Sequence, residues 1–214
     1  GILSRGGTIL GTSNRADPFK YPVMQGEEEY VYLDRSQQGV LNFESLGLEA
    51  LIAIGGDGTM AASSGMVDKG MPIVGVPKTI DNDLMGTDVT FGYDSALQIA
   101  TDAIDRIHTT AQSHHRVMLI EVMGRYAGWL ALGSGLAGGG DIILLPEIPY
   151  DMSAICDAIK KRNAQGKNFS IVVVGEGAHP MGGKMHISRT VKNSPDAIRL
   201  GGISYQIAAQ LEGL

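Results

Sequence analysis

Cysteine is almost absent from this chain of 214 residues: Cys156 is the single one, so no internal disulfide can support the fold. A lone cysteine is typical of proteins from a reducing compartment. The sequence also lacks an apolar run of membrane-spanning length, and its first residues form no secretory signal. We therefore expect a cytoplasmic protein with no membrane partner.

Clusters of basic residues are missing as well. The net charge at pH 7 is −6, and the Lys and Arg residues are scattered along the chain. Nucleic acids and anionic membranes are bound mainly through basic patches. The composition therefore argues against nucleic acid as a partner.

Glycine and apolar residues, by contrast, are plentiful, with 30 glycines and 43% hydrophobic residues. Predicted strands and helices alternate along the chain, which is typical of an α/β fold with a mainly parallel sheet. Asp94 is the expected N-cap of a long amphipathic helix, and the polar, Gly-rich stretch 175–195 is expected to be a loop or an irregular excursion. Strands are expected at 50–54, 72–76, 117–122, 142–145 and 170–174, and further helices at 59–69, 127–136, 153–164 and 202–211.

A domain boundary is expected where the long helix begins, close to residues 91–94. It divides the chain into residues 1–92 and residues 93–214, each an α/β domain.

The first chemically distinctive motif is Gly55-Gly56-Asp57-Gly58-Thr59, directly after an apolar run. Its glycines permit a tight turn, and free amides at the start of the following helix can bind phosphate. Asp57 is suited to hold Mg²⁺ that bridges phosphates, because Mg²⁺ takes one or two carboxylates together with phosphate oxygens. An Asp-Gly turn without a ligand is the alternative.

The second motif, Pro77 to Asp83, places Lys78, Thr79, Asp81 and Asp83 after the next buried strand. Such a concentration of charge is costly unless a metal, substrate or partner balances it. A carboxylate beside an acceptor hydroxyl can take its proton during phosphoryl transfer. Because the two motifs follow successive strands, we expect both at the sheet edge where α/β enzymes bind ligands. A solvated acidic turn is the alternative.

Further candidates are Arg116, Met123-Gly124-Arg125 and Glu176, all next to predicted strands. Arginine suits phosphate through bidentate hydrogen bonds, and Glu176 could accept hydrogen bonds from a sugar hydroxyl. A surface salt bridge for Arg116, a helix-entry turn for Met123-Gly124 and a structural role for Glu176 are the alternatives.

Together these motifs resemble the phosphofructokinase family along the whole chain. The motif at residues 55–59 is shared with NAD kinases and lipid kinases, whereas Thr-Ile-Asp-Asn-Asp followed by Met-Gly-Arg at the family's spacing is far more specific. The resemblance is carried by residues 6–13, 55–59, 77–83, 113–116, 123–125 and Glu176.

The resemblance implies two Rossmann-like domains with the site in the cleft between them. It also implies a glycolytic, allosteric enzyme that transfers a phosphoryl group to the 1-hydroxyl of fructose 6-phosphate with Mg²⁺. In this family pattern Asp81 accepts the proton with Thr79, Lys78 and Arg125 beside it, and Asp57 holds the metal. Arg116 reaches the sugar phosphate of a neighbouring subunit, so a homo-oligomer, dimer or tetramer, is implied. The nucleotide contacts are Arg15 and Gly55 to Thr59; the sugar-phosphate contacts are Thr79, Asp81, Asp83, Met123, Gly124, Arg125 and Glu176.

Gly58 and Lys78 bear on the phosphoryl donor. Members that use pyrophosphate resemble one another in carrying Asp at the position of Gly58 and Lys at the position of Lys78. Typical bacterial ATP enzymes have Gly at both positions. This chain has one of each, as in the mixed-substrate group, and Gly58 leaves room for the α-phosphate of ATP. ATP is therefore the expected donor.

Three alternatives to this function are retained. They are a pyrophosphate-dependent enzyme, a non-catalytic sugar-phosphate-binding or regulatory subunit and, least favoured, an NAD or lipid kinase.

Both ends of the sequence depart from the family pattern. The chain starts at Gly1 without Met, whereas family members begin with a strand and a Gly-rich donor-phosphate loop. Members also continue past the position of Leu214 into a segment with further Arg and His residues. We expect the chain to be a fragment of a longer subunit, truncated at both ends and weak or inactive alone.

Overall fold

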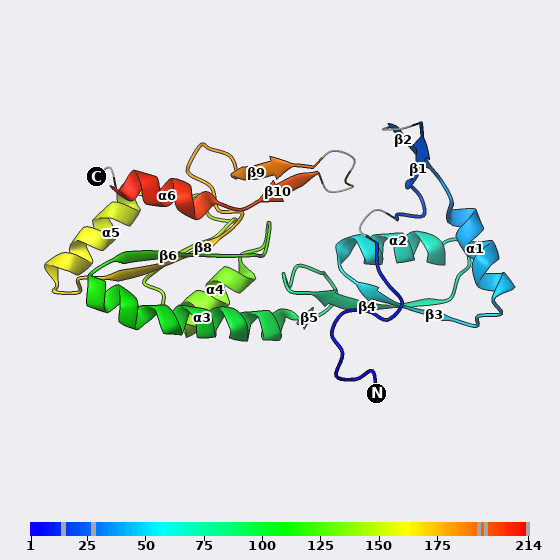
Figure 1. The fold of residues 1–214 in the computed structure, drawn as a ribbon, viewed down its shortest axis with the longest axis horizontal. Helices are drawn as coiled ribbons and strands as arrows, with labels where there is room; N and C mark the ends of the chain where they lie inside the picture. The colour runs from blue at the N-terminus through cyan, green and yellow to red at the C-terminus, as the bar shows by residue number, and fades with distance from the viewer. Residues whose placement is uncertain (14–15, 27–28, 192–193, 195–196, 213–214) are drawn as a thin grey trace. The chain divides into compact units, whose positions relative to one another are not determined.

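The computed structural model of the chain describes residues 1–13, 16–26, 29–191, 194 and 197–212. Helices and strands alternate through most of it (Figure 1). The strands are β1 (Tyr21–Gln25), β2 (Glu29–Leu33), β3 (Leu51–Gly55), β4 (Ile73–Thr79), β5 (Phe91–Gly92), β6 (Val117–Val122), β7 (Ile142–Leu144), β8 (Ser170–Gly175), β9 (Ile187–Thr190) and β10 (Ile198–Leu200). The helices are α1 (Ser36–Ser45), α2 (Asp57–Val67), α3 (Tyr93–His114), α4 (Trp129–Ala137), α5 (Met152–Ala164) and α6 (Ile203–Glu212).

The chain forms two compact units. The first comprises Gly1–Val76 with Val191–Ala197, and the second comprises Pro77–Thr190 with Ile198–Leu214. The division falls within β4, because the end of that strand packs with the residues that follow it. The expected boundary between two α/β domains, after residue 92, is a separate statement from this division into compact units and stays a prediction.

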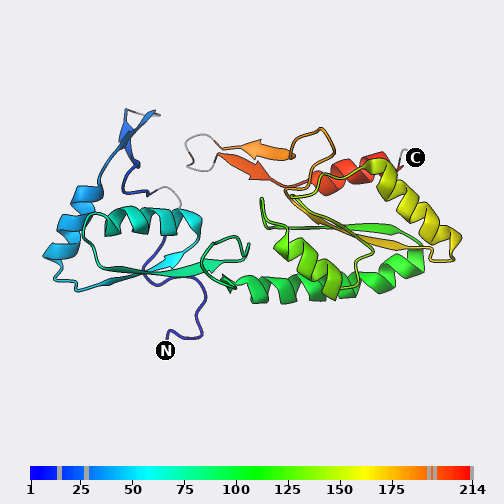
Figure 2. The same ribbon diagram turned by 180° about the vertical axis from the view of Figure 1, so that it is seen from behind.

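The second unit is built around a parallel sheet in the order β6-β8-β7. Helices α3 and α4 cover one face of this sheet, and α5 and α6 cover the other (Figures 1 and 2). All six residues of β8 are buried, because this strand has a neighbour on each side and helices on both faces. Alternate residues of β8 point into two separate cores. Val172 and Val174 pack with α5 and α6, whereas Ile171 and Val173 pack with α3 and α4.

The first unit has a smaller core. Val40 of α1 and Met66 of α2 pack with Met71, and Phe19, Phe43 and Ile73 lie against them. This unit also contains β3 and the first residues of β4, which are neighbours in the sheet order β3-β4-β5; the end of β4 and the parallel strand β5 belong to the second unit. This arrangement confirms the predicted α/β class with parallel sheets.

Some local expectations were wrong. Gly92, with φ 109°, is the N-cap of α3. Asp94 lies in the first turn, where its negative charge interacts favourably with the helix dipole. The stretch 175–195 contains β9, which pairs with β10 as an antiparallel hairpin. The hairpin of β1 and β2 was also not foreseen. Such small hairpins depend on backbone pairing more than on a buried apolar face, so periodicity gives little signal for them.

Among the described residues, no helix combines the length and the apolar character needed to cross a bilayer.

The core of the second unit generates a stability prediction within a single helix. Ile104 of α3 is fully buried, whereas Ile99 of the same helix is 70% exposed. Ile104→Ala should lower the free energy of unfolding by about 2 to 5 kcal/mol, because it leaves a cavity against the sheet. Ile99→Ala should change it by no more than about 0.5 kcal/mol in urea denaturation. Equal losses in the two variants would contradict the packing described here.

Candidate active site

All three non-glycine residues with positive φ in the described part of the chain lie in motifs singled out from the sequence, and two of them lie in turns that follow strands. Asn82 has φ 54° in the loop after β4, and Arg125 has φ 51° in the turn after β6. Non-glycine residues rarely adopt this conformation, and it concentrates at functional sites. Both turns are therefore fixed by specific contacts.

Asp81 is half-buried in the loop after β4, and its backbone N–H donates a 3.2 Å hydrogen bond to the hydroxyl of Thr79. Burial raises the pKa of the Asp81 carboxyl above its usual value, and the negative charge of Asp83 adds to the rise. A side-chain hydrogen bond between the Asp81 carboxyl and Thr79 and the positive charge of Arg125 offset part of this rise in pKa. A carboxylate in such a setting is suited to accept a proton.

The turn after β6 is shaped by close backbone contacts. Gly124 has φ 130°, and the backbone N–H of Arg125 donates a 3.0 Å hydrogen bond to Oε1 of Glu176. A Cβ atom on Gly177 would collide with the carbonyl oxygen of Arg125, so a glycine is required at that position. The Arg125 guanidinium lies 4.9 Å from the centre of the Tyr126 ring.

Glu176 follows the central strand β8 and completes the group. Burial is the main cause of its raised pKa; the amide of Arg125 lowers this pKa, while the negative charges of Asp81 and Glu121 raise it. Within the second unit the charge of Arg125 thus acts on Asp81, and the charge of Asp81 acts on Glu176; these residues follow β6, β4 and β8. Sequence reasoning predicted all three of these residues.

Glu121 was missed by sequence reasoning, although it lies beside this group. Its Oε1 accepts a 2.7 Å hydrogen bond from the amide of Gly202, and its Oε2 accepts bonds of 2.9 and 2.7 Å from the amide and hydroxyl of Ser204. The carboxylate thereby caps the start of α6 and ties that helix to β6. An acidic residue within an otherwise apolar strand was the available signal.

The Gly-Gly-Asp-Gly-Thr motif lies in the first unit, at the start of α2. Gly56 is the N-cap, and no side chain caps the free amides of this helix. A Cβ on Gly55 would overlap the side chain of Thr59, whereas a Cβ on Gly58 would meet no atom within 4 Å. Amides open to solvent at a helix start are suited to bind phosphate.

The residues present fit one mode of Mg²⁺ binding, in which substrate phosphates supply most of the ligands. Asp57 is exposed in the first turn of α2, and the described residues contain no cluster of three or more His, Cys, Asp or Glu side chains suited to a metal. Mg²⁺ commonly binds through one or two carboxylates together with substrate phosphates. Asp57 therefore fits a metal that arrives with phosphates, and not a cage made by the protein alone.

The other predicted residues are more dispersed. Arg116 is exposed just before β6, whereas the exposed Met123 follows this strand, at a distance on the order of 20 Å along it. The second unit therefore does not bring Arg116 to Arg125. Lys78 is exposed near the end of β4, where it pairs with Phe91 of β5. Arg15 lies outside the described residues.

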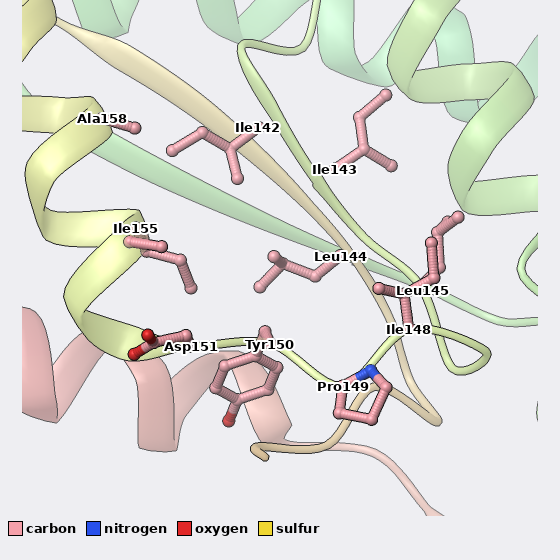
Figure 3. Close-up of a pocket in the computed structure, with 11 residues that line it drawn as sticks. Ile142, Ile143, Leu144, Leu145, Ile148, Pro149, Tyr150, Asp151, Ile155 and Ala158 are labelled. Carbon is pink, nitrogen blue, oxygen red and sulfur yellow. The ribbon is translucent and has the colours of Figure 1, made fainter.

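A cavity of about 250 Å³ lies between β7 and α5, as Figure 3 shows. Its lining is mostly aliphatic, with Ile142, Leu144 and Ile155 on its walls and Tyr150 and Asp151 at one end. Its described lining residues include no Lys or Arg, the side chains that best suit a phosphate ligand. The strand ends of the second unit are therefore the better candidate site.

Comparison with known proteins identifies the family. The profile of the family described as Phosphofructokinase matches residues 1–212, and the chain belongs to this family.

Three similar proteins illustrate the range of the family. "ATP-dependent 6-phosphofructokinase 2" of Clostridium perfringens is 55% identical over 214 residues, a match that covers 100% of this chain and 58% of that protein. The T-state structure of Pichia pastoris phosphofructokinase matches with a TM-score of 0.70 and 34% identity, over 84% of this chain and 20% of that one. A pyrophosphate-dependent phosphofructokinase from Nitrosospira multiformis matches with a TM-score of 0.66 and 26% identity, over 84% of this chain and 46% of that one. The chain thus spans little more than half the length of two of its curated relatives, 58% of one and 57% of the other.

The raised pKa of Asp81 has a consequence for stability. Its folded pKa lies above its unfolded value, so the wild type loses stability as the pH rises through the interval between them. Asp81→Asn removes this loss and should stabilise the full-length protein at pH 7 by about 0.5 to 1 kcal/mol, a modest gain because the carboxyl is half exposed and screened by solvent. Urea denaturation at several pH values should show the gain shrinking toward the ordinary Asp pKa of about 3.9. Asp88→Asn, in the same loop, is the control, and a gain independent of pH would contradict the electrostatic cause.

Proposed function

We propose that the full-length protein is an ATP-dependent 6-phosphofructokinase, which transfers a phosphoryl group to the 1-hydroxyl of fructose 6-phosphate and gives fructose 1,6-bisphosphate. The observation that carries the proposal is the half-buried Asp81 carboxyl with its raised pKa, coupled to Arg125 and Glu176. The family membership and the names of the relatives support it.

In this proposal Asp81 takes the proton of the acceptor hydroxyl as the phosphoryl group arrives. The Thr79 hydroxyl, already bonded to the amide of Asp81, orients this carboxyl. The guanidinium of Arg125 stabilises charge on the transferring phosphoryl group. Asp83, Met123, Gly124 and Glu176 contact the sugar phosphate together with Thr79, Asp81 and Arg125.

The nucleotide side is assigned to the motif at the start of α2. The free amides from Gly55 to Thr59 hold donor phosphates with Arg15, and Asp57 holds Mg²⁺. When bound, Mg²⁺ neutralises phosphate charge. Lys78 adds positive charge near the group that is transferred. In the domain division that we propose, residues 1–92 form the domain that binds Mg²⁺ and nucleotide and residues 93–214 form the domain that binds the sugar phosphate. Thr79, Asp81 and Asp83 of the first domain also contact the sugar phosphate.

ATP is favoured over pyrophosphate by the open space at Gly58, where an α-phosphate can be accommodated. Pyrophosphate is the second candidate donor, because Lys78 matches the pattern of enzymes that use it and a pyrophosphate-dependent enzyme is among the structural relatives.

We further propose that the active protein is a cytoplasmic homo-oligomer, a dimer or tetramer. Arg116 lies at the far end of β6 from Arg125, so it is well separated from the candidate site of its own unit. An exposed guanidinium in this place suits the sugar phosphate of a neighbouring subunit.

The central test is turnover by the full-length protein with fructose 6-phosphate and either donor. We expect the wild type to be active with ATP, and Asp81→Asn to lower kcat by about 10²- to 10⁴-fold, the usual loss on removal of a general base. Nucleotide binding, measured by calorimetry, should be nearly unchanged. Asp88→Asn is the matched control in the same loop. Turnover retained by Asp81→Asn would refute its role, and a wild type active only with pyrophosphate would establish the alternative donor.

Gly58→Asp tests the choice of donor. Because a Cβ atom at this position would meet no atom from other parts of the chain within 4 Å, the variant should fold normally. Its carboxylate should repel the α-phosphate and lower kcat/KM for ATP at least about 10-fold, the effect of roughly 1.4 kcal/mol of repulsion. Steady-state kinetics with ATP and pyrophosphate, alongside thermal denaturation, provide the measurement. Unchanged ATP kinetics in a folded variant would overturn the steric and electrostatic argument.

A further inference from the structure

The loop between β4 and β5 is closed by a set of hydrogen bonds that we call the Asn82 clasp, made by Thr79, Asn82 and Thr90. Oδ1 of Asn82 accepts a 2.9 Å hydrogen bond from the amide of Thr90. The hydroxyl of Thr90 donates a 2.8 Å bond to the carbonyl of Thr79 and lies 3.4 Å from the same Asn82 oxygen. The clasp thus joins the two ends of the loop, and Asp81 lies inside it.

The clasp contains one residue with an unusual backbone conformation and one with buried polar groups. Asn82 adopts φ 54°, a left-handed conformation that Asn tolerates better than most residues. Thr90 is only 2% exposed, so its hydroxyl and amide depend on these partners in place of water. Short-range turn chemistry alone would not need a partner eight residues away along the chain.

We propose that Asn82 and Thr90 are positioning residues for phosphoryl transfer, which hold the Asp81 carboxyl toward the acceptor hydroxyl by closing the loop around it. The inference rests on the proposed function, in which Asp81 is the base. Asn82 immediately follows Asp81, and Thr90 bonds the carbonyl of Thr79, whose hydroxyl accepts from the Asp81 amide. A base held in one geometry gains rate because small displacements of a reacting group are costly.

Three charged residues affect the titration of Asp81, and a test of the clasp has to account for each of them. Asp83 lies in the same loop, Arg125 follows β6, and Glu176 follows β8. A looser loop would give the Asp81 carboxyl more solvent and change its distance from all three. The clasp variants should therefore alter the titration of Asp81 as well as the rate.

The experiment uses the full-length protein and substitutions that separate conformation from bonding. Asn82→Gly keeps the left-handed conformation but removes the acceptor, and Thr90→Val removes the hydroxyl. Each should lower kcat about 10- to 100-fold with the KM for ATP within about twofold. Thr90→Ser should restore most of the rate. Thr87→Val, which removes an exposed hydroxyl bonded within the same loop, is the matched control and should stay within about twofold.

Asn82→Asp separates charge from geometry. It keeps an acceptor for the Thr90 amide and adds a negative charge beside Asp81. The limiting kcat at high pH should stay within about threefold of the wild type, while the acidic limb of the pH profile moves to higher pH. In Asn82→Gly the same limb should move to lower pH, because Asp81 becomes more hydrated. A merely structural role of Asn82 would leave the acidic limb of Asn82→Gly where it is in the wild type, whereas the added charge of Asn82→Asp moves that variant's limb in either case.

Two outcomes would overturn the clasp. In one, Asn82→Gly keeps the limiting kcat although hydrogen exchange at the Thr90 amide is faster. In the other, Asn82→Gly lowers the residual rate of Asp81→Asn by the same factor as that of the wild type, which means that it does not act through Asp81.

Failure of the proposed function is recognised separately. It is shown by a wild-type protein with no fructose 6-phosphate kinase activity from either donor. In that case NMR titration of the Asp81 carboxyl decides on the clasp. A lower pKa in Asn82→Gly than in the wild type supports the clasp, and an unchanged pKa overturns it.

Discussion

The burial of β8 is the constraint on which the second unit depends. This strand hydrogen-bonds to β6 on one side and β7 on the other, and helices shield both of its faces. A strand enclosed in this way has little freedom to shift, because each residue has a fixed partner and a fixed core. Glu176 directly follows it, and the amide of Arg125 bonds to Glu176. The position of the candidate site is therefore inherited from the most rigid part of the sheet.

Negative charge gathers where this rigid part ends. The negative charge of Asp83 raises the proton affinity of Asp81, and the charges of Asp81 and Glu121 raise that of Glu176, while Arg125 is the positive charge that moderates Asp81. Glu121 is satisfied differently, by two amides and a hydroxyl at the start of α6. The structure thus separates Glu121, a carboxylate that holds a helix, from the half-buried carboxylates of the candidate site, Asp81 and Glu176. Such a division is common at sites that trade stability for chemistry.

The sequence predicted the α/β class, most helices and strands, and the residues at the strand ends, because apolar runs and Gly-rich turns give strong periodic signals. It could not reveal the partners that fix those residues. The bond from Thr90 to Asn82 and the cap from Glu121 to Ser204 join positions that are 8 and 83 residues apart, and no local pattern records such pairs. The N-cap of α3 was misplaced by two residues because Asp94 suits both a cap and a first turn.

The strand order β6-β8-β7 also governs when the second unit can form. Within the described chain, β6 and β7 each hydrogen-bond only to β8, the last of the three strands to be synthesised. The first pair, Val117 with Ser170, closes a loop of more than fifty residues before any ladder bond compensates for the lost chain entropy. During translation the apolar faces of β6, α3 and α4 therefore stay uncovered until β8 has been synthesised. In this interval the nascent chain depends most on protection from aggregation.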